Sequence, residues 1–112
     1  AAGADVQAAQ ANFDKVVAVA LEETDSAISN WVQLRRRIAE LNIAQRLSQE
    51  GARLTRVRYQ EGAESLLGVL EAERIALAAD EQWVMAKRDL TLATARCYTA
   101  MAGGLDSAYL RP

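Results

Sequence analysis

The chain has 112 residues, enough for a single domain, and its 13 basic and 15 acidic residues leave a net charge of −2. Because both signs are mixed along the sequence, it lacks the basic patch that nucleic-acid binding requires. It contains no His, the commonest general base and metal ligand, and its single cysteine, Cys97, cannot form an internal disulfide. These features argue against an enzyme and against a bound cofactor or metal.

The composition favours long helices. The sequence has six Gly and one Pro, and that Pro is residue 112, so little in the interior interrupts a helix. No apolar run approaches the roughly 20 residues of a membrane-spanning helix, and the first residues lack the features of a signal peptide. The abrupt start is what we expect of a fragment of a longer protein.

A long helix is predicted over residues 5–59. In its middle, apolar residues alternate in steps of three and four, which is the spacing of a coiled-coil seam. These residues are Ile28, Trp31, Leu34, Ile38 and Leu41. Gly51 lies inside the helix, where we expect a bend rather than a break.

A turn at residues 60–65, with Gly62 at its centre, separates this helix from a second one over residues 66–102. In the second helix an apolar position recurs every seven residues and carries a second apolar position beside it. The first set is Val69, Ala76, Trp83, Leu90 and Cys97, and the second is Leu70, Leu77, Val84 and Tyr98. This doubled stripe predicts more than one neighbour. Gly103-Gly104 predicts the helix end, followed by an irregular tail over residues 103–112.

The predicted fold is therefore all-α, a long antiparallel helical hairpin or coiled coil. The residues expected to pack between helices are Trp31, Leu34, Ile38, Leu41, Leu70, Leu77, Trp83 and Val84. Because the first helix is the longer one, part of its apolar stripe needs another partner. The candidates are another subunit, a missing part of the chain, or a fold-back of the first helix into a bundle.

Three stretches resemble motifs of a known family. Residues 20–28 are similar to A-L-x-E-V-E-D-A-L, with departures at Thr24 and Ser26. Residues 58–74 resemble R-Y-x-x-G-x-x-x-x-L-D-V-L-D-A-x-R, and residues 97–105 resemble L-Y-x-A-L-G-G-G-W. These motifs are those of the C-terminal half of the outer-membrane efflux proteins, the TolC-like ducts.

The resemblance implies a segment of an α-helical barrel in the periplasm of a Gram-negative bacterium. Members are trimers that meet the outer membrane through a β-barrel, which these residues do not include. The implied partners are two further protomers, a periplasmic adaptor protein and an inner-membrane pump, in multidrug efflux or type I secretion. No cofactor is implied. The alternative function is a free-standing coiled-coil interaction or adaptor module.

The resemblance also implies site residues at the turn. Arg58, Tyr59, Gly62 and Ala63 would form the tip that docks the adaptor, although Gly62 is equally suited to the turn alone, and Arg58 and Tyr59 to bracing it. Glu71 and Glu64 are candidates for a gate facing the lumen, and an ordinary solvated face is the alternative for Glu71. Gly68 departs from the family, because a second acid usually occupies its position, and some members carry a basic residue in place of Glu64.

Overall fold

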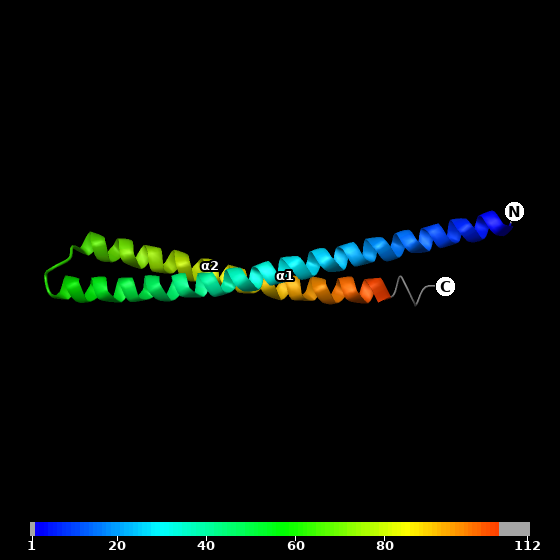
Figure 1. Cartoon of the computed structure of the whole chain (residues 1–112). Helices are drawn as coiled ribbons and strands as arrows, with labels where there is room; N and C mark the ends of the chain where they lie inside the picture. The colour runs from blue at the N-terminus through cyan, green and yellow to red at the C-terminus, as the bar shows by residue number, and fades with distance from the viewer. Residues whose placement is uncertain (1, 106–112) are drawn as a thin grey trace. The chain divides into compact units, whose positions relative to one another are not determined.

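The computed structural model describes residues 2–105, which form two α-helices joined by one turn (Figure 1). Helix α1 spans Ala2–Gln60 and α2 spans Leu66–Leu105. The described residues contain no β-strand. The prediction of an all-α helical hairpin is confirmed.

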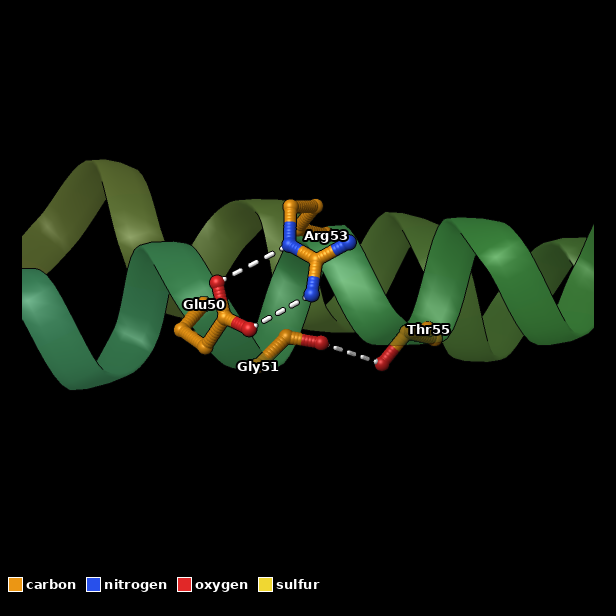
Figure 2. Close-up of polar contacts among 4 residues, drawn as sticks. All are labelled: Glu50, Gly51, Arg53 and Thr55. Carbon is orange, nitrogen blue, oxygen red and sulfur yellow. Dashed lines mark hydrogen bonds and ion pairs between the residues drawn. The ribbon is translucent and has the colours of Figure 1, made fainter.

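Helix α1 continues through Gly51, and its neighbours supply local support there. The Arg53 guanidinium donates two hydrogen bonds to the Glu50 carboxylate, at 2.9 and 2.7 Å, and the Thr55 hydroxyl donates to the Gly51 carbonyl at 2.7 Å (Figure 2). The cost of one glycine in a helix interior is only about 1 kcal/mol. The helix therefore tolerates Gly51 without a break.

The chain divides into two units, each built from both helices. The tip unit is Leu34–Leu90 and contains the turn; the terminal unit comprises the described parts of Ala1–Gln33 and Thr91–Pro112. Each unit has its own contacts between α1 and α2, and these contacts show how the two helices run within it.

In the tip unit, α1 and α2 are antiparallel. Gln45 Nε2 donates to Asp80 Oδ1 at 3.2 Å, and Arg56, further along α1, forms an ion pair with Glu73, which comes earlier in α2. Thus residue numbers rise along one helix as they fall along the other. The most deeply buried positions between the helices carry mainly small side chains, and no large side chain among the described residues is fully buried. The buried residues of this unit are Gln45, Ala52, Val69, Ala76 and Ala86.

The terminal unit pairs the two helices in the same antiparallel sense. The Trp31 indole N–H donates to Thr94 Oγ1 at 2.9 Å, and Ala93 is buried beside it in sequence. Nearer the chain ends, a Cβ on Gly104 would lie 3.5 Å from the Ala20 Cβ, an ordinary packing distance. Helix α2 runs through Gly104 to Leu105, although the sequence pattern predicts a tail from residue 103; residues 106–112 of that tail lie outside the described residues.

The residues expected to pack between helices fall into two groups. Half-buried ones are Trp31, Leu34, Ile38, Leu41 and Trp83. Exposed ones are Leu70, Leu77 and Val84, whose exposed fractions are 58%, 64% and 50%. Each exposed residue comes directly after a residue that faces the seam. One half of the doubled stripe is therefore covered within the chain and the other half is not.

Candidate interaction tip

The turn between the helices is closed by backbone hydrogen bonds around Gly62. The Ala63 amide donates to the Arg58 carbonyl at 2.8 Å, and the Gly62 amide donates to the Tyr59 carbonyl at 3.0 Å. This pair of bonds is the Schellman motif, which requires a left-handed residue after the helix. Gly62 supplies it, with a φ of 77°.

Gly62 is needed for its backbone conformation and not because a side chain would lack room. Nothing lies within 4 Å of the position that a Cβ on Gly62 would take. A side chain would therefore fit, but the left-handed backbone would cost it roughly 1–2 kcal/mol. The glycine is needed for the turn, and its face is open to a partner.

Helix α2 begins with a side-chain cap from Ser65. The Gly68 amide donates to the Ser65 hydroxyl oxygen at 3.1 Å, which satisfies one of the N–H groups that a helix start leaves unpaired. The Ser65 amide in turn donates to Glu64 Oε1 at 3.0 Å. Both helix ends at the turn are thus closed by residues of the turn itself.

The residues expected at a docking tip lie on the surface of this turn. Arg58, Tyr59 and Ala63 are exposed, with Tyr59 at 45%. The Arg58 carbonyl takes part in the helix cap, while its guanidinium forms no hydrogen bond or ion pair with any described residue. The tip therefore presents a cationic side chain, Arg58, and an aromatic one, Tyr59, close to Gly62.

The two acidic candidates have different surroundings. Glu71 is exposed, and its carboxylate accepts two hydrogen bonds from Arg74, at 2.6 and 3.2 Å, which lower the pKa of Glu71 below its usual value. Glu64 is half-buried and lies against Gly68. The face that Glu71 presents in an assembly stays a prediction.

Two polar links across the tip unit were not expected from the sequence. The Arg56–Glu73 ion pair and the Gln45–Asp80 hydrogen bond both join α1 to α2. Gln45 and Asp80 lie at nearly equal distances in sequence from Gly62, so pairing positions outward from the turn would have found that contact, whereas Arg56 and Glu73 do not lie at equal distances from it. A groove runs beside these links. Its lining residues are Arg46, Gln49, Glu50, Ala52, Arg53, Arg56, Glu73, Ala76, Leu77 and Asp80.

The described part of the chain holds no cluster of three or more side chains suited to a metal ion. Neither helix there has a stretch long and apolar enough to cross a membrane.

The sequence profile of the outer membrane efflux proteins matches residues 1–103. The chain belongs to the outer membrane efflux protein family. Searches of the curated proteins and of the solved structures return no match. The resemblance carried by the three motifs is thereby confirmed, and with it a component of an outer-membrane transport channel rather than of an enzyme family.

Proposed function

We propose that this member of the outer membrane efflux family forms part of the wall of a periplasmic helical duct and of the tip at its inner end. Three copies would line the conduit, and the turn at Gly62 would meet a periplasmic adaptor that couples the duct to an inner-membrane pump. The chain would act passively, opening at the tips when the adaptor engages. Export by efflux or type I secretion is the corresponding activity.

The observation that supports the wall role is the exposed stripe on α2. Leu70, Leu77 and Val84 recur every seven residues, each more than half or about half exposed, along a helix whose other apolar stripe is already covered by α1. Burying such a side chain fully contributes about 1.5–3 kcal/mol. A continuous row of them on one helix face is the surface that a neighbouring helix covers in a barrel wall.

The support for the tip role is the open surface around Gly62. The turn is rigidly closed by its own backbone bonds, while Arg58, Tyr59 and Ala63 are exposed around a residue without a side chain. Such a surface allows another backbone to approach closely. It also offers a cation and a ring for specific contacts.

Cysteine cross-linking in cell membranes tests the wall role. In a Cys97→Ala background, Leu77→Cys is expected to give covalent species larger than the monomer when labelled with a short reagent that reacts with the thiol and, on illumination, with any side chain nearby. Gln82→Cys is the matched control, because residue 82 is exposed and lies well away from residue 77 around the helix. Equal cross-linking at both positions, or none at residue 77, would contradict the proposal.

A further inference from the structure

The side chain of Glu64 occupies the space next to Gly68. A Cβ on residue 68 would lie 2.7 Å from Glu64 Cδ and 3.2 Å from Glu64 Cγ, with the carboxylate oxygen nearer still. Non-bonded carbon atoms do not approach this closely without repulsion. Glu64 in its present position and a side chain at residue 68 therefore exclude each other.

Ser65 holds the Glu64 carboxylate in this place. The Ser65 amide donates to Glu64 Oε1 at 3.0 Å, and the Ser65 hydroxyl lies 3.5 Å from the same oxygen. That hydroxyl also accepts the hydrogen bond from the Gly68 amide. The carboxylate thus lies at the start of α2, where the partial positive charge of the helix end favours an anion.

Other glycines of the chain do not share this arrangement. Around Gly51 and Gly62 no atom lies within 4 Å of the position of an added Cβ, and of the two only Gly62 needs a left-handed backbone. Gly68 is helical and has no positive φ, so its missing side chain matters for space. The three atoms nearest to that space all belong to the Glu64 side chain.

We propose that the missing side chain of Gly68 leaves the space that the Glu64 carboxylate occupies, and that the two residues together fix an acidic group beside the first turn of α2. Glu64 precedes α2, and its carboxylate lies in the space that a side chain on Gly68 would take; residue 71 follows residue 68 at the helical spacing of three. The carboxylate therefore lies on the side of α2 that also carries Glu71. These contacts involve residues 64–68 alone and are independent of whether the tip docks an adaptor.

Amide hydrogen exchange in the whole protein tests the pair. Gly68→Ala is expected to displace Glu64 and so to speed exchange of the Ser65 amide by about two- to tenfold, the loss of one net hydrogen bond. Glu64→Ala should give the same acceleration, and adding Gly68→Ala to it should give no more. Gly51→Ala, placed in open space in the same unit, is the matched control and should leave Ser65 unchanged.

The Val69 amide separates this local effect from unfolding of the turn. It donates to the Ser65 carbonyl at 3.2 Å and so reports whether the first turn of α2 is intact. Its protection should be kept in Gly68→Ala. The proposal is overturned if Ser65 exchange does not change in that variant, if the same acceleration recurs in the Glu64→Ala background, or if Val69 loses protection together with Ser65.

Discussion

Arg56 on α1 and Glu73 on α2 form an ion pair that joins the two helices close to the turn. Their side chains are 52% and 35% exposed, so water screens the attraction without removing it. The pair spans the hairpin, whereas the Glu50–Arg53 and Glu71–Arg74 pairs each lie within one helix. It therefore bears directly on how α1 and α2 stay aligned in the tip unit.

Removal of this pair should weaken the tip unit slightly. Glu73→Gln is expected to lower the free energy of unfolding by about 0.2–1 kcal/mol at low salt, with the difference shrinking as salt screens the charges. Urea unfolding at two salt concentrations measures it. Glu73→Gln combined with Arg56→Gln should lower the free energy of unfolding by less than the sum of the two single changes, and a loss equal to that sum or larger would contradict a favourable pair.

Replacement of Gly62 should destabilise the hairpin. Gly62→Ala forces a side chain into the left-handed region and should lower the free energy of unfolding by roughly 1–2 kcal/mol. Gly62→Asn should lose less, because Asn tolerates this conformation better. Gly51→Ala, in a helical and open position, should instead be neutral or stabilising, and urea midpoints of the three variants compare them.

The Glu71–Arg74 pair predicts a pH effect whose sign follows from the lowered pKa of Glu71. A lowered pKa in the folded state means that the pair stabilises the fold at pH values above the usual 4.5 of a Glu, and that this contribution is lost as the pH falls below it. Arg74→Gln should raise the pKa of Glu71 back toward 4.5. Carboxyl carbon shifts followed by NMR during an acid titration measure it, and an unchanged midpoint would refute the assignment.

In the terminal unit, the Trp31–Thr94 hydrogen bond should contribute measurably to helix pairing. Replacing Thr94 by Val keeps its shape and removes the acceptor, which should cost about 0.5–1.5 kcal/mol plus the penalty of an unpaired indole N–H. Trp31→Phe removes the donor. In the Trp31→Phe background, Thr94→Val should lower the free energy of unfolding much less than it does in the unaltered protein. Urea unfolding of the single and double variants measures this, and an equal loss in both backgrounds would show that the bond contributes nothing.

The sequence pattern predicted the helices, the turn and one seam, because each depends on local spacing. Val69, Ala76 and Trp83 recur every seven residues, and a glycine flanked by polar residues marks the turn. The end of α2 was harder to predict. Gly103 and Gly104 resemble a stop signal, yet Gly104 packs against Ala20, so close approach of two helices explains a glycine that the pattern assigns to a helix end.

The polar contacts of the candidate site could not be predicted in the same way. The Arg56–Glu73 pair depends on the register that the turn imposes, and the seating of Glu64 against Gly68 depends on a side-chain rotamer. Neither is encoded in residue spacing alone. The exposed row at Leu70, Leu77 and Val84 was expected to need a neighbour, and what covers it stays a prediction.

The small side chains of the tip unit seam have one further effect. Ala52, Ala76 and Ala86 let the helices lie close, and these three positions provide few projections that would resist one helix sliding along the other. The closed turn and the two polar contacts between α1 and α2, Arg56–Glu73 and Gln45–Asp80, therefore help to hold the axial alignment near the tip. Raising the salt concentration should consequently affect the alignment of α1 and α2 at lower concentrations than those that affect helix content.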